Sequence, residues 1–113
     1  MKPLILALSA LYLLMLPMTA QARDCGIASW YHEGSRTANG ERYRPDGLTA
    51  AHRTLRFGTI LKVTAVATGR QVLVRINDRG PFIKGRFLDL SRGAKNVLRM
   101  SGLAHVCIER IGR

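Results

Sequence analysis

An acidic residue, Asp78, stands where an apolar, strand-like run ends in a turn. The run from Val72 to Ile76 is rich in β-branched residues, and the Gly80-Pro81 step after Asp78 forces the chain to bend. Such a turn requires the glycine and the proline, but it does not require the acid. The sequence therefore allows two interpretations of Asp78, a polar residue of a surface turn and a catalytic acid delivered into a cleft.

Three further ionisable residues lie in loops or at strand ends, where a rigid scaffold presents functional groups. They are Glu41 in "TANGERY", His52 in "AAHRTL" and Asp89 in "LDLS". Two carboxylates that flank one cleft can cleave a glycosidic bond, because one donates a proton to the leaving oxygen while the other stabilises positive charge or acts as a base. Each residue also has an ordinary interpretation: Glu41 as a solvated charge, His52 as a hydrogen-bonded strand end, and Asp89 as an acid bonded to backbone amides near a helix.

Aromatic and polar neighbours of these residues are candidates for substrate contact. Trp30 and Tyr31 carry flat apolar rings with polar tips, which suit stacking on sugar rings, although Trp30 can equally belong to the core. Asn77 and Arg79 flank Asp78 and are predicted to contact the same substrate. Arg79 can alternatively pair with a nearby carboxylate.

The first 22 residues are typical of a secretory signal peptide. Lys2 supplies a positive start, an apolar stretch runs from Leu4 to Leu16, and Ala20-Gln21-Ala22 has small residues at the cleavage spacing. The apolar stretch would span roughly 20 Å as a helix, which is too short for a bilayer core. We predict a signal peptide over residues 1–22 and one small domain over residues 23–113, with an uncleaved membrane anchor as the alternative.

The chain is strongly basic, with a formal net charge of +11. In a cytosolic protein this balance would suggest nucleic acid as the partner. An exported protein meets the polyanions of the cell wall and envelope instead. We therefore expect an exported monomer that binds the wall, without nucleic acid and without stable insertion into a membrane.

The two cysteines, Cys25 and Cys107, lie near the two ends of the predicted domain. In an oxidising compartment an even pair in a small domain is most simply a disulfide, which would contribute on the order of 4 kcal/mol to stability. Lipidation of Cys25 is the alternative, but the charged pair Arg23-Asp24 before it does not fit a lipoprotein signal. The cysteines and histidines show no spacing typical of a zinc site, so neither a metal nor a cofactor is expected.

The remaining pattern is that of a β protein with one helix. Ala67-Thr68-Gly69 separates two β-branched runs, as in a hairpin, and Ser91 can cap a helix. Five or six strands with one short helix indicate a small β-barrel. The predicted strands cover residues 26–31, 48–52, 59–66, 70–77, 86–90 and 104–111, and the predicted helix covers residues 92–100.

Five motifs stand in the order in which they occur in the rare lipoprotein A (RlpA-like) family: "ASWY", "TANGE", "LTAAHRTLRFGT", "VRINDRGPF" and "RFLDLSRGA". The chain resembles this family over about residues 26–111. The resemblance implies a six-stranded double-psi β-barrel with one short helix, a fold shared with expansins and barwin-like proteins. It also implies a periplasmic lytic transglycosylase that cleaves peptidoglycan glycan strands lacking stem peptides, between N-acetylmuramic acid and N-acetylglucosamine, and leaves 1,6-anhydro ends.

The same resemblance assigns catalytic residues. It matches the essential acids of the family to Glu41 and Asp78, and its histidine to His52, and it implies that all three converge on one groove. Asp78 is expected to donate the proton, while Glu41 would stabilise the oxocarbenium-like centre or accept the proton of the attacking hydroxyl. The division of the two acid roles stays open at this point.

Two departures from the family shape the remaining expectations. The chain shows neither an evident lipid-attachment cysteine nor a peptidoglycan-binding domain after residue 111, so we expect a periplasmic or envelope protein that is not lipid-anchored. A non-catalytic module that binds or loosens the wall, as the expansins do, is the alternative function.

Overall fold

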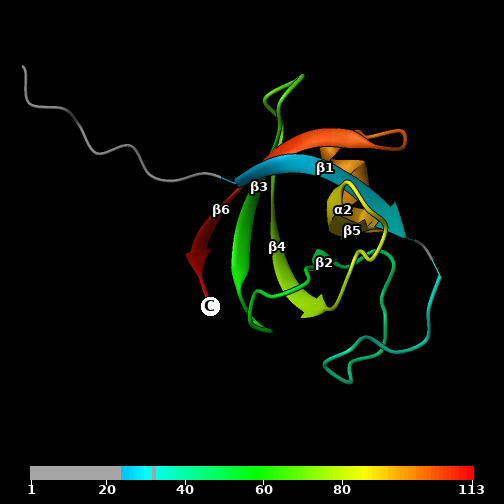
Figure 1. Cartoon of the computed structure of the whole chain (residues 1–113). Helices are drawn as coiled ribbons and strands as arrows, with labels where there is room; N and C mark the ends of the chain where they lie inside the picture. Colours follow the sequence, from blue (N-terminus) through cyan, green and yellow to red (C-terminus); the bar gives the residue numbers. More distant parts are fainter. Residues whose placement is uncertain (1–23, 32) are drawn as a thin grey trace, which may run out of the picture.

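The computed structural model describes residues 24–31 and 33–113, and the predicted signal peptide over residues 1–22 lies outside them. All six predicted strands and the predicted helix are present, with their ends shifted by no more than two residues (Figure 1). The elements are β1 (Asp24–Tyr31), β2 (Thr49–Ala51), β3 (Ile60–Ala65), β4 (Gln71–Asp78), β5 (Arg86–Ser91), α2 (Arg92–Leu98) and β6 (Ala104–Gly112).

The six strands form a closed barrel in the order β1-β5-β2-β4-β3-β6. Two neighbouring pairs, β1 with β5 and β2 with β4, are parallel, and the other pairs are antiparallel. Closure leaves no strand with a free edge. The predicted class, a mainly β barrel of six strands with one short helix, is confirmed.

The barrel closes around a core set by the alternation of the strands. Every second residue of β3 from Leu61 to Ala65 and of β4 from Val72 to Ile76 is buried. Leu88 and Leu90 of β5 are fully buried in the same core, so the residue between them faces the outside of the barrel. This orientation of Asp89 matters for the site.

Helix α2 begins where Ser91 caps it, as predicted. The Ser91 Oγ accepts a hydrogen bond from Ala94 N (3.3 Å) and donates one to Gly47 O (2.6 Å). Ala94 and Leu98 are buried, whereas Val97 is exposed. In residues 24–31 and 33–113, no helix has the length and apolar character needed to cross a membrane.

The start of α2 also holds the loop that precedes β2. Gly93 N donates to Pro45 O (2.7 Å), and a Cβ atom at Gly93 would lie only 2.6 Å from Asp46 O. The loop therefore packs directly against the helix, in space that only a glycine leaves open.

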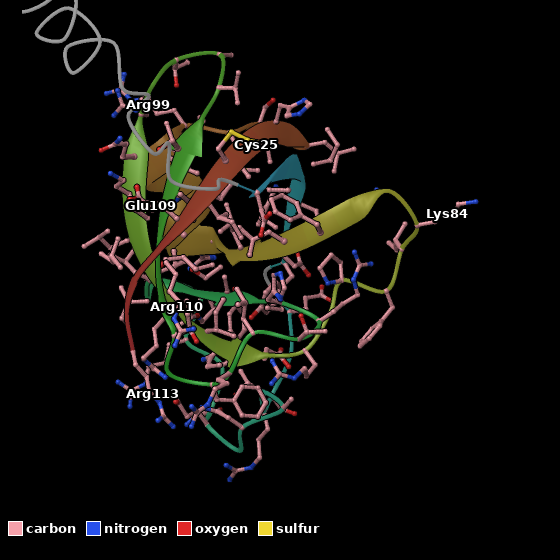
Figure 2. The ribbon with its side chains drawn as sticks, turned by 60° about the vertical axis from the view of Figure 1, so that its left-hand side comes forward. Cys25, Lys84, Arg99, Glu109, Arg110 and Arg113 are labelled. Carbon is pink, nitrogen blue, oxygen red and sulfur yellow. A yellow bond between two sulfur atoms is a disulfide. The ribbon has the colours of Figure 1, made fainter. Side chains whose placement is uncertain are left out.

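The predicted disulfide is confirmed. Cys25 on β1 and Cys107 on β6 are direct partners across the two strands, and their Cα atoms lie 4.0 Å apart. Figure 2 shows the bond beside the Cys25 label, at the seam between the first and the last strand. The disulfide therefore reinforces the pairing that closes the barrel.

Candidate active site

Two adjoining hollows contain most of the residues that the sequence singled out. The first, which we call the carboxylate hollow, has a volume of about 400 Å³ and is lined by Ser29–Tyr31, Ala51, Asp78–Ile83, Arg86 and Asp89. The second, the arginine hollow, has a volume of about 590 Å³ and is lined by Glu41, Arg42, Arg44, Gly47–Thr49, Arg75 and Asn77. They adjoin along β2, where Thr49 lines the arginine hollow and Ala51, two residues further on, lines the carboxylate hollow.

Asp78 ends β4 and reaches the carboxylate hollow. Its Oδ1 accepts hydrogen bonds from Ala38 N and from Arg79 N, both at 2.8 Å. Two N–H donors at one oxygen fix the orientation of the carboxyl group. A proton on this group therefore has to reside on Oδ2.

Asp89 shares the carboxylate hollow with Asp78. In the strand register Ala51 of β2 is the partner of Asp78 on one side and of Asp89 on the other. Because neighbouring strands lie about 4.8 Å apart, the two acidic residues stand roughly 10 Å apart at their backbones, with a small alanine between them. This arrangement places two carboxyl groups on opposite sides of one hollow.

The surroundings of Asp89 raise the pKa of its carboxyl group. Burial raises the pKa of the Asp89 carboxyl group, although the hydrogen bond that Ser29 Oγ donates to its Oδ1 (3.0 Å) and the charge of Arg86 act in the opposite direction. Ser91, not Asp89, caps the helix, and the printed partner of the Asp89 carboxyl group is the Ser29 hydroxyl. The sequence interpretation named Asp89 as a candidate but did not include it among the catalytic residues, although the two flanking leucines indicated that it faces outward.

The rings of Trp30 and Tyr31 line the carboxylate hollow but are partly covered. Tyr31 stacks on Tyr43 with ring centroids 4.6 Å apart, and the Lys95 Nζ lies 4.6 Å from the centroid of the Trp30 ring. The Tyr31 Oη is buried without a hydrogen-bond partner in the described chain, and burial together with the charge of Asp78 raises the pKa of this phenol. The ring of Tyr31 is therefore stacked on one side and its hydroxyl is shielded from solvent.

The sequence interpretation missed one exposed aromatic ring in the carboxylate hollow, that of Phe82. Phe82 is 80% exposed and lines the carboxylate hollow beside Ile83. A Cβ atom at Gly80, whose φ is +123°, would lie 3.5 Å from the Phe82 ring, so one side of the ring packs against a bare backbone. Its position directly after the predicted turn was the only signal in the sequence.

Glu41 lines the arginine hollow rather than the carboxylate hollow. Its Oε1 and Oε2 accept hydrogen bonds from Arg75 Nη1 (2.5 Å) and Nη2 (2.8 Å), and Asn39 Nδ2 donates to Oε1 (2.6 Å). These bonds, that of Arg75 first, lower the pKa of Glu41 to about 2. Glu41 is therefore ionised near neutral pH and is a poor proton donor.

A short turn connects Glu41 to Asp78. Thr37 N donates to Glu41 O (2.8 Å), Asn39 N donates to Asn77 O (3.2 Å), and Ala38 N is the donor that holds Asp78. The Glu41 ion pair thus anchors the turn that orients the Asp78 carboxyl group. Asn77 itself is buried, lines the arginine hollow, and leaves its Oδ1 without a hydrogen-bond partner among the described residues.

His52 lines neither hollow, and the Arg79 guanidinium is engaged outside them. The His52 Nδ1 accepts hydrogen bonds from Thr54 N and Leu55 N, both at 3.1 Å, so the ring proton resides on Nε2. Burial, followed by the charges of nearby arginines, lowers the pKa of His52. Arg79 Nη1 donates to His52 O (3.1 Å) and Leu55 O (2.7 Å), and its guanidinium lies 4.0 Å from the centroid of the Phe57 ring. Both side chains hold the segment after β2 in place.

Of the three predicted catalytic residues, the structure places only Asp78 in the carboxylate hollow. The predicted contact residues Trp30, Tyr31 and Arg79 line that hollow too, Arg79 with its guanidinium held elsewhere, whereas Asn77 lies next to Glu41. In residues 24–31 and 33–113 no group of three or more histidine, cysteine, aspartate or glutamate side chains is arranged to hold a metal ion.

Comparisons with known proteins agree with this architecture. The chain is 56% identical over 95 residues to the probable endolytic peptidoglycan transglycosylase RlpA of Nostoc sp., covering 78% of this chain and 26% of that protein. It is 54% identical over 92 residues to the endolytic peptidoglycan transglycosylase RlpA of Campylobacter jejuni, covering 77% of this chain and 34% of that protein. The chain thus spans about a quarter to a third of the length of these relatives.

A solved structure supports the fold. The apo expansin of Clavibacter michiganensis superposes with a TM-score of 0.64 at 20% identity, covering 80% of this chain and 50% of that one. With the closed six-stranded barrel, this confirms the predicted double-psi β-barrel. The model of the Lytic transglycolase family matches residues 23–109, which is most of the chain. The chain therefore belongs to the Lytic transglycolase family.

Proposed function

We propose that the domain is a lytic transglycosylase that cleaves peptidoglycan glycan strands between N-acetylmuramic acid and N-acetylglucosamine. It would prefer strands without stem peptides and leave 1,6-anhydro ends. The observation that carries this proposal is the pair of carboxyl groups, Asp78 and Asp89, on either side of Ala51 in one open hollow. The names of the relatives, which are peptidoglycan transglycosylases, support the same substrate.

In the proposed mechanism Asp89 donates the proton. A general acid has to keep its proton near the working pH, and burial raises the pKa of Asp89 in that direction. The proton passes to the bridging oxygen, the bond from this oxygen to C1 of the muramic acid breaks, and the N-acetylglucosamine end leaves as an alcohol. The C6 hydroxyl of the muramic acid then attacks C1, and its proton returns to the Asp89 carboxylate.

Asp78 stabilises the positive charge that develops at C1. Its carboxyl group is held rigidly by two backbone donors, as a preorganised charge has to be. The sequence interpretation gave the proton to Asp78; the buried position of Asp89 favours the reverse division of roles. Glu41 supports the reaction through the turn that orients Asp78, not by contact with the sugar.

The sugar would lie against Phe82 and Ile83. Phe82 offers the exposed ring face that a pyranose requires, whereas Tyr31 and Trp30 are partly covered.

We also propose that the domain works outside the cytoplasm, in the periplasm or envelope, as a monomer without a lipid anchor. The disulfide supports an oxidising compartment. Because the sulfur of Cys25 is bonded to Cys107, it is not free to carry a lipid.

One experiment separates an enzyme from a wall-binding module. The exported form of the protein is incubated with purified glycan strands that lack stem peptides, and the products are analysed by mass spectrometry. New 1,6-anhydro-muramic ends are expected. Binding to the strands without new ends would support the alternative, a module of the expansin kind, which the structural similarity to an expansin favours.

A further inference from the structure

The arginine hollow carries positive charge that the protein does not neutralise. Of its three arginines, Arg75 is paired with Glu41. The other ion pairs in the described chain join Lys62 to Glu109 and Arg92 to Asp46, so the guanidinium groups of Arg42 and Arg44 have no acidic partner there. Both are exposed side chains lining the same hollow.

The local backbone directs these two arginines to one side. Residues 35–43 form a narrow hairpin, in which Arg36 and Arg42 pair as neighbours across the strands and Tyr43 N donates to Ser35 O (3.0 Å). Along the extended segment, Tyr43 is buried while Arg42 and Arg44 are exposed, as the period of two requires. Since like charges directly across two strands repel, Arg36 and Arg42 make an anion favourable at this position.

The hollow adjoins the carboxylate hollow closely enough for one glycan strand to occupy both. Thr49 lines the arginine hollow and Ala51 lines the carboxylate hollow, and two residues along a strand span about 7 Å. That distance is on the scale of one sugar unit. A group that binds near Arg42 and Arg44 can therefore belong to the sugar next to the bond that is cleaved.

We propose that Arg42 and Arg44 form a subsite for the free lactyl carboxylate of N-acetylmuramic acid. The inference rests on the proposed function and deepens it. Each muramic acid carries a lactyl ether whose carboxyl group is ionised when no stem peptide is attached and becomes a neutral amide when one is. Guanidinium groups bind carboxylates through charge-assisted hydrogen bonds, so the subsite gains strength from the charge that a stem peptide removes. Preference for strands without stem peptides then follows from charge, in addition to size.

The first test keeps Arg42 and Arg44 unchanged and compares two forms of one substrate. Glycan strands without stem peptides are compared with the same strands after their lactyl carboxyl groups have been converted to methylamides, which removes the charge and adds little bulk. We expect the methylamide strands to bind ~10-fold more weakly at low salt, and the difference to shrink as salt rises. Binding is measured in the Asp89→Asn background, in which turnover is blocked.

The second test uses matched variants. The double variant Arg42→Gln/Arg44→Gln should reduce the preference for free carboxylates below ~2-fold, because it removes both unpaired guanidinium groups. The control is Arg110→Gln/Arg113→Gln, which changes the net charge equally. Arg110 on β6 and Arg113 directly after it line neither hollow, and Figure 2 shows both on the opposite side of the view from Lys84. This control should keep the preference, and circular dichroism confirms equal folding.

The outcomes separate the subsite from the proposed function. Equal binding of the two substrate forms by the wild-type Arg42/Arg44 pair would overturn the subsite, as would a preference that survives in the double variant or disappears equally in the control. New anhydro ends without any preference for carboxylates would support the proposed enzymatic activity and contradict the subsite. Carboxylate-dependent binding without new ends would support the subsite and contradict the enzymatic activity.

Discussion

The two adjoining hollows of this barrel handle charge in opposite ways. In the carboxylate hollow, Asp78 and Asp89 have no ion-pair partner among the described residues, and burial raises the pKa of Asp89. In the arginine hollow, the acid Glu41 is held in a two-point ion pair with Arg75 and its pKa is lowered to about 2. The difference suggests a division of work, in which the first hollow moves a proton and the second binds and positions.

The comparison also shows why the type of a residue is a poor guide to its role. Glu41 lies in a loop and Asp78 at the end of β4, and the sequence interpretation paired these two acids. Their hydrogen-bond donors differ: a guanidinium binds the Glu41 carboxylate, whereas backbone N–H groups bind that of Asp78.

The largest expected effect belongs to the carboxylate hollow. Asp89→Asn and Asp78→Asn should each reduce cleavage by at least ~100-fold, the lower range for the loss of a general acid or a charge stabiliser. Wild-type activity should fall as the pH rises above the raised pKa of Asp89, because the acid then loses its proton. Rates of anhydro-end formation at equal folded fraction provide the measurement. The control is Asp46→Asn, whose exposed carboxylate pairs with Arg92 outside both hollows. Full activity in Asp89→Asn would show that Asp89 is not the proton donor and would favour Asp78 in that role.

The substitution Gly93→Ala at the start of α2 should displace the loop beside the arginine hollow and leave the carboxylate hollow unchanged. Gly93→Ala places a Cβ atom 2.6 Å from Asp46 O and 2.7 Å from Gly47 O, so the loop beside the hollow has to move. Overpacking of this kind costs about 1–3 kcal/mol, more than the ~1 kcal/mol that alanine gains in a helix. We expect a lower midpoint in urea unfolding and weaker binding of the glycan. Gly102→Ala, with no atom within 4 Å of the added Cβ, serves as the control. Equal stability of the two variants would contradict the tight packing.

Glu41→Gln should reduce cleavage about 10-fold, less than either aspartate variant. The substitution removes the ion pair with Arg75 and loosens the turn whose Ala38 N–H orients Asp78. The rate constant should fall more than the affinity, because the affected group acts in the reaction. Glu109→Gln removes a surface ion pair with Lys62, and because both residues line neither hollow it should have no such effect. A loss as large as that of Asp78→Asn would indicate direct contact of Glu41 with the reacting sugar.

Phe82→Ala should weaken binding of the glycan by about 3- to 10-fold and leave stability unchanged. The ring is 80% exposed, so its removal costs stacking area on the sugar and little packing within the protein. Titration calorimetry with the Asp89→Asn background measures the affinity, and Phe82→Trp, which keeps an aromatic face, should retain it. Unaltered affinity in Phe82→Ala would indicate that the sugar stacks on Trp30 instead of on Phe82.

The smallest effect concerns stability in acid. Glu41 has a pKa of about 2 in the folded protein against an ordinary value of 4.5, so its contribution is present above pH 4.5 and is lost as the pH falls toward 2. Because its side chain is 40% exposed, solvent limits this contribution to less than ~1 kcal/mol. Urea unfolding of the wild type and of Glu41→Gln should therefore differ at pH 6 and converge near pH 2. A difference that persists at pH 2 would exclude the ion pair as its source.

The elements of the fold were predictable because each follows from local physics. The alternation of β3 and β4 indicates half-buried strands, the Ser91 hydroxyl indicates a helix cap, and the even cysteine count indicates the disulfide. The order of the strands was not predictable in this way, because β5 and β4 both pair with the three-residue strand β2 through long connections.

The site depended on that order. Only the insertion of β2 between β5 and β4 places Asp89 opposite Asp78, and only the fold of the loop after β1 places Glu41 against Arg75, 34 residues away. The coverage of Tyr31 by Tyr43 is a contact of the same loop. Sequence motifs identified Asp78 and Glu41 as important, whereas their partners required the three-dimensional arrangement.

The disulfide between the first and the last strand has a consequence for survival among proteases. It joins residues separated by 82 positions, so the backbone from Cys25 to Cys107 is a closed covalent ring that contains both hollows. The loop with Phe82 and Ile83 is exposed and is a natural place for a protease to cut. A single cut there opens the ring without releasing a fragment, since both pieces stay joined through the cysteines and through the barrel. A molecule cut once in this loop therefore keeps all of its residues covalently connected.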